Sequence, residues 1–155
     1  MQAQIRPAAA ADVPEIAALE QQIFGSHAWS EAAVYEEVAG QHRDYFVAEI
    51  AGKIAGYAGV LTLGGEADVQ TIALAESSRG HGLGRQLLLE LGTAATERGA
   101  KQIFLEVRAD NPTAIALYQK FGFTQIAVRE KYYQPGGIDA VIMRAPLPFA
   151  ENAQI

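Results

Sequence analysis

A glycine-rich turn between two regular segments constrains the fold more than any other part of this sequence. Residues 79–85 read Arg-Gly-His-Gly-Leu-Gly-Arg, after a β-rich run and before apolar residues at helical spacing. Glycines let backbone N–H groups approach an anion, and a helix N-terminus favours negative charge. The turn is therefore typical of a phosphate-binding loop. A turn that only starts a helix is an equally good interpretation of the same residues.

Two familiar phosphate loops do not fit the turn. A Walker loop ends in Gly-Lys-Ser/Thr, which this segment lacks. A dinucleotide-binding fingerprint starting at the first glycine of the turn would need a third glycine where Arg85 stands.

Apolar spacing and turn residues predict a mixed α/β fold in one domain. Alternating or continuous apolar runs predict strands at residues 4–6, 45–50, 54–63, 67–74, 102–107, 123–133 and 138–145. Helical spacing predicts helices at residues 13–24, 31–39, 85–98 and 112–121. The result is one sheet of about seven mostly antiparallel strands with four helices. We expect this domain to span residues 1–147, with a short tail at 148–155.

Three helices carry N-terminal signals. Asp12 followed by Glu15 predicts a variant of the capping box. Ser30 is the expected N-cap of the second helix, and Asn111 before Pro112 is that of the last one.

Composition restricts the class of protein. The chain of 155 residues has no cysteine, which removes disulfides, thiolate metal sites and a cysteine nucleophile. The net charge of −6 argues against general nucleic-acid binding. Residues 1–78 hold 3 basic and 11 acidic residues, and residues 79–155 hold 9 and 7. The more basic second half could therefore bind an anionic ligand. No apolar run reaches the roughly 18 residues of a membrane span, and we expect a soluble cytoplasmic protein.

The turn and a later stretch together resemble one family. Arg79-x-x-Gly82-x-Gly84 is similar to the acetyl-CoA pyrophosphate loop of the GNAT acetyltransferases. The stretch Leu-Glu-Val-Arg-x-x-Asn at residues 105–111, with Ala-Ile-Ala-Leu-Tyr at 114–118, resembles the RimI-like branch, which acetylates protein N-termini. The resemblance covers residues 5–147. It implies the GNAT fold, acetyl-CoA as co-substrate without a metal, and a protein N-terminus as acceptor, such as that of a ribosomal protein beginning with alanine.

The resemblance also implies a cofactor site. The pyrophosphate would bind the turn, and backbone groups of one strand would hold the pantetheine arm and the thioester carbonyl. Asn111 would add a hydrogen bond to the pantetheine, although an N-cap is its default interpretation. The residues implied are Ile72, Ala73, Leu74, Arg79, Gly80, His81, Gly82, Leu83, Gly84, Arg85 and Asn111.

Two residues are implied as catalytic. Glu106 lies inside an apolar strand, where a carboxylate is costly unless it is paired or used. The family uses this residue as general base, directly or through a water. By sequence alone, an exposed residue or a partner of Arg108 is an equal interpretation. Tyr118 would be the general acid for the leaving thiolate, whereas its helical spacing alone favours a core aromatic residue.

The acceptor side is implied to involve Trp29, Tyr132 and Tyr133. The family often has proline before this tryptophan, whereas here the residue is Ala28. The acidic first half, including Glu36 and Glu37, could attract a basic peptide, although charged helix faces are usually only solvated. The three histidines are isolated, so no metal site is expected. A lysine or small-amine acceptor, and a non-catalytic acyl-CoA-binding module, remain as alternatives. The sequence does not set the oligomeric state, and a monomer is compatible with it.

Overall fold

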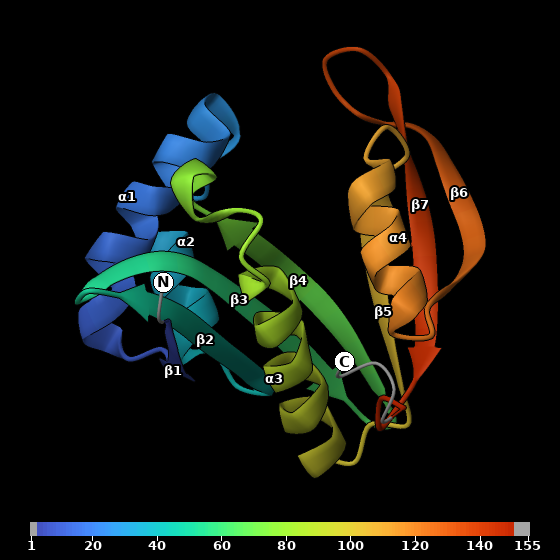
Figure 1. Cartoon of the computed structure of the whole chain (residues 1–155), viewed down its shortest axis with the longest axis horizontal. Coiled ribbons are helices and arrows are strands. Elements are labelled where there is room, and N and C mark those ends of the chain that lie inside the picture. Colours follow the sequence, from blue (N-terminus) through green and yellow to red (C-terminus); the bar gives the residue numbers. More distant parts are fainter. Residues whose placement is uncertain (1–2, 151–155) are drawn as a thin grey trace.

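The structure, a computed structural model, describes residues 3–150 and contains seven strands and four α-helices in that range (Figure 1). In chain order these are β1 (Gln4–Pro7), α1 (Val13–Phe24), α2 (Glu31–Ala39), β2 (Arg43–Ile50), β3 (Lys53–Leu63), β4 (Glu66–Leu74), α3 (Leu83–Glu97), β5 (Gln102–Arg108), α4 (Pro112–Lys120), β6 (Thr124–Tyr133) and β7 (Ile138–Pro146). The predicted order of elements is confirmed. Most predicted boundaries lie within two residues of those observed.

All seven strands form one sheet in the order β1-β2-β3-β4-β5-β7-β6. Every neighbouring pair is antiparallel except β4 and β5, which are parallel. The predicted mixed and mostly antiparallel sheet is therefore confirmed. The parallel step arises because α3 carries the chain from the end of β4 back to the start of β5, as a crossover connection requires.

The parallel pair is short. Its register contains three residue pairs, from Glu66↔Gln102 to Asp68↔Phe104. β4 continues to Leu74 on the β3 side, where its register runs without a break from Gly59↔Thr71 to Gly56↔Leu74. In Figure 1, β4 and β5 start close together near the lower end of the sheet and separate upward. Past Asp68, the edges of β4 and β5 that face each other are therefore not paired with one another.

Helices cover both faces of the sheet. On one face, α3 packs over β2, β3 and β4 through Leu87, Leu88 and Leu91, which are fully buried. On the opposite face, Val13, Ile16 and other apolar residues of α1 join a second cluster with α2 and β3. The alternation of β3 explains this arrangement, because Ala58 and Tyr57 point to different clusters.

The helix starts follow two of the three predicted caps. The Ser30 hydroxyl accepts a hydrogen bond from the Ala33 N–H at 3.1 Å, and Asn111 accepts one from the Ala114 N–H at 3.2 Å. The predicted capping box at Asp12 is wrong, since its side chain caps no amide of α1. Its carboxylate instead binds Arg6 and the Ala9 N–H.

The Glu15 carboxylate does not reach back to the helix start either. It accepts a hydrogen bond from the Ile54 N–H at 2.7 Å, which ties α1 to β3. A capping-box match considers only the first amides of the helix, whereas Asp12 finds its donors just before the helix and Glu15 finds one on β3.

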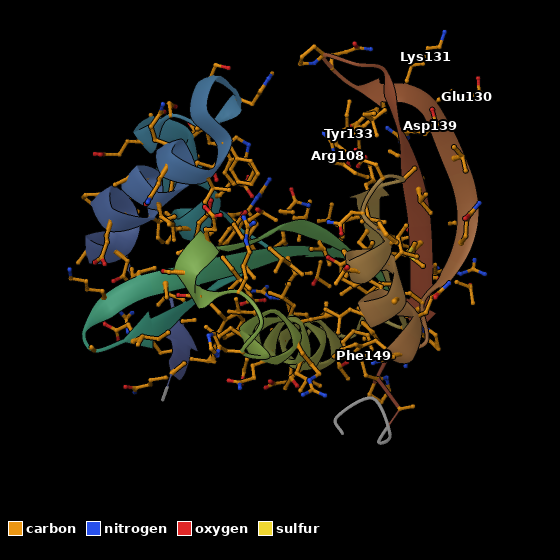
Figure 2. All side chains as sticks on the ribbon, turned by 45° about the horizontal axis from the view of Figure 1, so that its top comes forward. Arg108, Glu130, Lys131, Tyr133, Asp139 and Phe149 are labelled. Atoms are coloured by element: carbon orange, nitrogen blue, oxygen red, sulfur yellow. The ribbon has the colours of Figure 1, made fainter. Side chains whose placement is uncertain are left out.

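The chain after β7 continues along the α3 face of the sheet. Phe149 packs edge-on against Phe121, with ring centroids 5.1 Å apart, and lies 5.9 Å from the ring of Phe123. It also contacts α3 at Gly92, where an added Cβ would overlap its ring. Figure 2 shows Phe149 at the end of the sheet away from the turn that joins β6 to β7. Residues 151–155 of the expected tail lie outside the described residues.

Candidate active site

The glycine turn leads directly into α3. Gly80 and Gly82 have φ of 83° and 78°, a left-handed conformation that glycine adopts without a Cβ penalty. Gly82 is the N-cap of α3, and no side chain caps the first amides of the helix. No acidic residue lies in its first turn either. Uncapped amides at a helix N-terminus favour an anion, so this end of α3 fits a phosphate group.

The residues of the turn differ in their exposure to solvent. Arg79 and His81 are exposed, whereas Leu83 is 2% exposed and belongs to the core. Any contact of Leu83 with a ligand at this turn would therefore come from its backbone. Gly84 and Arg85 are half-buried.

The strand segment 72–74 lies where β4 has left β5. Ala73 is buried against α1 and α2, while Ile72 and Leu74 pack against the α3 cluster. Their side chains are thus core residues. The register with β5 has already ended at Asp68, so the edge of this segment that faces β5 has no strand beside it. This is the arrangement that a backbone-binding ligand needs.

Glu106 lies in the second half of β5, past the point where the strands separate. Its side chain is 34% exposed, and Arg129 of β6 lies 3.7 Å from its carboxylate. The interpretation of Glu106 as a partner of Arg108 is wrong, because Arg108 pairs with Asp110 at 2.9 Å. Glu106 is therefore partly exposed, with the Arg129 cation nearby, and it follows the point at which β5 separates from β4.

Tyr118 lies on α4, which runs beside β5 and β7 (Figure 1). The side chain is half-buried and meets Phe123 edge-on, with ring centroids 5.8 Å apart. Burial raises the pKa of Tyr118 above its ordinary value, with a smaller contribution from Tyr133. The hydroxyl therefore keeps its proton at neutral pH, as a proton donor must.

The β6–β7 hairpin carries an aromatic and cationic cluster. The Tyr132 and Tyr133 rings meet edge-on, with centroids 5.1 Å apart. The guanidinium of Arg108 lies 5.4 Å from the Tyr133 ring, and that of Arg129 lies 5.4 Å from the Tyr132 ring. Figure 2 shows Arg108 and Tyr133 side by side, pointing toward the space between the two halves of the sheet. Burial, and then Glu106, raise the pKa of Tyr133.

Trp29 lies across that space, before α2, where its half-buried ring packs against the α1–α2 cluster. The Ala28 N–H donates to the Gly25 carbonyl at 3.1 Å. Proline, which the resemblance leads one to expect at position 28, has no N–H and would remove this bond. The departure from the family motif thus has a local structural role in this chain.

Four of the eleven acidic residues in the first half of the chain form ion pairs within the fold. Asp12, Glu37, Asp44 and Glu49 each form an ion pair with an arginine. Glu37 also accepts a hydrogen bond from the Tyr45 hydroxyl. These carboxylates stabilise the fold, which weakens the argument that they attract a basic peptide.

Three further charged residues near the site were missed at the sequence level. Arg129 reaches Glu106 only through the pairing of β6 with β7, which is interrupted after that residue. Asp68 ends the β4–β5 register, and its pKa is raised by burial and then by Glu66 and Glu106. The third is Glu20, a buried carboxylate of α1. Its position four residues after Ile16 on the apolar face was the available signal.

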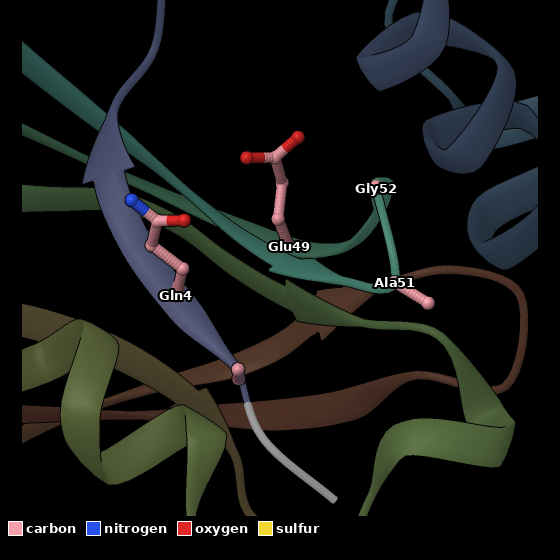
Figure 3. Close-up of a pocket in the computed structure, with 5 residues that line it drawn as sticks. Gln4, Glu49, Ala51 and Gly52 are labelled. Atoms are coloured by element: carbon pink, nitrogen blue, oxygen red, sulfur yellow. The ribbon is translucent and has the colours of Figure 1, made fainter.

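A hollow in the surface lies elsewhere. It has a volume of about 510 Å³ and is lined by Ala3, Gln4, Glu49, Ala51 and Gly52 beside the β2–β3 turn (Figure 3). Its carboxylate, Glu49, already binds Arg6 at 2.9 Å. None of the predicted site residues lines this hollow.

Residues 3–150 contain neither a metal-binding cluster nor a membrane-spanning helix. Within residues 3–150, no group of three or more His, Cys, Asp or Glu side chains could hold a metal ion. No helix in the same range is long and apolar enough to cross a membrane.

Comparison with known proteins places the chain in a family. A sequence profile of the acetyltransferase (GNAT) family matches residues 13–123, and the chain belongs to that family. Its relatives include the N-alpha-acetyltransferase RimI of Mycobacterium tuberculosis, 42% identical over 139 residues that cover 86% of each chain. A protein of Mycobacterium leprae is 45% identical over 139 residues, but the match spans only 38% of its length.

Solved structures show the same fold. The ribosomal-protein-S18-alanine N-acetyltransferase of Escherichia coli superposes with a TM-score of 0.86 at 32% identity, over 96% of each chain. A phosphinothricin acetyltransferase from Sinorhizobium meliloti, solved with acetyl-CoA, gives a TM-score of 0.82 at 26% identity, over 95% of this chain and 89% of the other.

Proposed function

We propose that this chain transfers an acetyl group from acetyl-CoA to the N-terminal α-amine of a protein. The observation that carries the proposal is the separation of β4 from β5 after Asp68, with Glu106 on one strand and the segment 72–74 on the other. The names of the RimI relatives support the acceptor class, and a ribosomal protein with N-terminal alanine is the first candidate.

The proposed co-substrate fits the residues present. The uncapped amides at the start of α3, with the residues from Arg79 to Arg85 around them, would hold the pyrophosphate. The free edge of residues 72–74 would bind the pantetheine arm, and an N–H of that segment would polarise the thioester carbonyl. Asn111 already uses its amide oxygen to cap α4, so a bond from Asn111 to the pantetheine would compete with the cap.

Two side chains would move the protons of the reaction. The acceptor nitrogen attacks the thioester carbonyl carbon, the C–N bond forms, and the C–S bond breaks. Glu106 would take the proton that the nitrogen loses, and Tyr118 would give its proton to the departing sulfur. No covalent bond to the protein is needed, which agrees with a chain that has no cysteine.

An α-amine is the easier acceptor for a carboxylate base. Its pKa is about 7.7–8.0, whereas that of a lysine side chain is about 10.4, so a larger fraction is neutral at pH 7. Trp29 on one side and Tyr132 with Tyr133 on the other would line the approach of the peptide. The two parts come from α1–α2 and from the β6–β7 hairpin.

The decisive experiment is mass spectrometry of a peptide library after incubation with acetyl-CoA. The proposal requires acetylation of free N-termini, with alanine among the preferred first residues, and no modification of matched peptides with a blocked N-terminus. Acetylation of lysine in the blocked peptides would favour the lysine alternative. Tight binding of coenzyme A without any acetylated product would leave a non-catalytic binding module.

A further inference from the structure

One buried carboxylate outside the proposed proton path accepts a hydrogen bond on each of its two oxygens. Glu20 of α1 is 3% exposed. The Tyr57 hydroxyl donates to its Oε1, and the backbone N–H of Trp29 donates to its Oε2 at 2.9 Å. Burying a carboxylate is costly unless its oxygens are hydrogen-bonded, so these two donors are what permits Glu20 at this position.

The two donors belong to parts of the chain that are remote in sequence and meet at the site. Trp29 ends the loop between α1 and α2, directly before the Ser30 cap. Tyr57 lies on β3, 1% exposed, and is paired with Ala73 of β4. Glu20 therefore connects the acceptor-side loop to the strand beside the segment proposed to hold the thioester.

We propose that Glu20 is a positioning residue for the acceptor. It fixes Trp29 relative to β3 and β4, and so determines how well the peptide N-terminus is held against the thioester. This inference rests on the proposed function, because it assigns the acceptor side to Trp29. Glu20 itself touches neither reacting atom in this proposal.

Removing the hydroxyl of Tyr57 breaks its hydrogen bond to Glu20 and leaves no cavity in the core. In Tyr57→Phe the ring still fills its space, but Glu20 keeps one unsatisfied oxygen in a buried position. Turning toward water lowers the free energy of such a carboxylate, because water then hydrates the unsatisfied oxygen. This rotation breaks the hydrogen bond from the Trp29 N–H to Glu20. The loop then loses its fixed position, while β4 and the glycine turn keep theirs.

The chain offers a matched control. The Tyr45 hydroxyl donates to the Glu37 carboxylate at 2.6 Å, and Tyr45 is 6% exposed. This second tyrosine–glutamate pair joins β2 to α2 and does not include Trp29. Tyr45→Phe therefore removes the same kind of bond and leaves the Trp29 contact intact, while Glu37 keeps its ion pair with Arg43 at 3.0 Å.

Steady-state kinetics with an alanine-initiated peptide separates the two variants. We expect Tyr57→Phe to raise the peptide KM by roughly five- to tenfold, which corresponds to the net contribution of one ordinary hydrogen bond. The acetyl-CoA KM should stay unchanged, and kcat should change by less than about twofold. Tyr45→Phe should leave all three values unchanged.

A spectroscopic measurement tests the connection without any enzyme assay. Trp29 is the only tryptophan in the chain, so intrinsic fluorescence reports this loop alone. Tyr57→Phe should shift the emission to longer wavelength and increase quenching by acrylamide, whereas Tyr45→Phe should do neither.

Each outcome decides the proposal. Changed Trp29 emission with a raised peptide KM in Tyr57→Phe alone supports it. Unchanged emission, or a peptide KM that moves equally in both variants or in neither, overturns it. If the wild type acetylates no peptide N-terminus, the proposed function fails; the acceptor role of Glu20 is then overturned as well, and the emission data still show whether Glu20 holds the loop.

Discussion

The guanidinium of Arg129 lies 3.7 Å from the carboxylate of Glu106, although their strands are separated in the sheet by β7. Both side chains are partly exposed, at 58% and 34%. An exposed pair at this distance contributes little to stability. The pair matters for the proposed reaction instead, because the carboxylate proposed as the base has the cation of Arg129 beside it as well as the acidic Asp68 of β4.

Replacement of Glu106 tests the proposed base. Glu106→Gln should lower kcat by about 10²- to 10⁴-fold, the usual contribution of a general base, because an amide cannot take the proton. The Kd of acetyl-CoA, measured by calorimetry, should remain the same. Arg129→Gln is the control, and it should change kcat by less than about fivefold because the ion pair is exposed. Unchanged turnover in Glu106→Gln would remove this residue from the mechanism.

The pH dependence of kcat tests Tyr118. Since burial raises the pKa of this hydroxyl above its ordinary value, the protonated donor persists as pH increases to about 10. We expect no loss of kcat in the wild type up to that pH, measured at saturating peptide and acetyl-CoA. Tyr118→Phe should lower kcat by about 10- to 100-fold at all of these pH values. A decline below pH 9 that is absent in Tyr118→Phe would contradict this assignment.

The pair between Arg6 and Asp12 predicts a loss of stability in acid. Arg6 holds the pKa of Asp12 below its usual range, so the folded state binds fewer protons than the unfolded state as the carboxyl titrates. Its stabilisation is complete above the unfolded pKa and disappears as pH falls through the folded value. The free energy lost in Asp12→Asn should therefore shrink between pH 6 and pH 3 in urea denaturation.

A similar pair provides the control for that measurement. Arg108 and Asp110 lie 2.9 Å apart, but both side chains are nearly half exposed, at 48% and 47%. The Asp12 side chain is 13% exposed. Asp110→Asn should therefore cost less than Asp12→Asn at pH 6, because solvent screens the exposed pair. An equal cost for the two variants would contradict the prediction.

The contact between Phe149 and Gly92 predicts a coupled effect on stability. Phe149→Ala should lower the free energy of unfolding by about 2 kcal/mol, less than for a fully buried phenylalanine. Gly92→Ala should cost about 1–3 kcal/mol, because the new Cβ overlaps the Phe149 ring. In the double variant the second cost should largely vanish, since the ring is gone. Additive costs would show that the two residues do not interact.

Much of the fold could be predicted from the sequence because its signals are local. The caps at Ser30 and Asn111, and the two left-handed glycines of the turn, place α2, α4 and α3. The parallel step between β4 and β5 follows from the crossover helix. The capping box at Asp12 failed because Arg6 and Ala9, which are outside the helix, offer its carboxylate better donors.

The site could be predicted only in part. The resemblance drew attention to Glu106 and Tyr118, but it gave no partner for either. The pairing of Arg129 with Glu106 depends on the β6–β7 register, and the contact of Glu20 with Tyr57 depends on how α1 packs on β3. Such contacts join distant parts of the chain, and residue spacing does not encode them.

The short register between β4 and β5 also means that little backbone pairing joins the two halves of the sheet. Three residue pairs carry the continuity of the backbone ladder across the middle of the sheet, while the β3–β4 and β5–β7 registers on either side are much longer. A molecule bound along the free edges would act as a temporary extra strand that joins the two halves. Amide hydrogen exchange in residues 69–74 and 105–108 should therefore slow markedly when coenzyme A is added. The bound ligand would then help to hold the two halves of the sheet together.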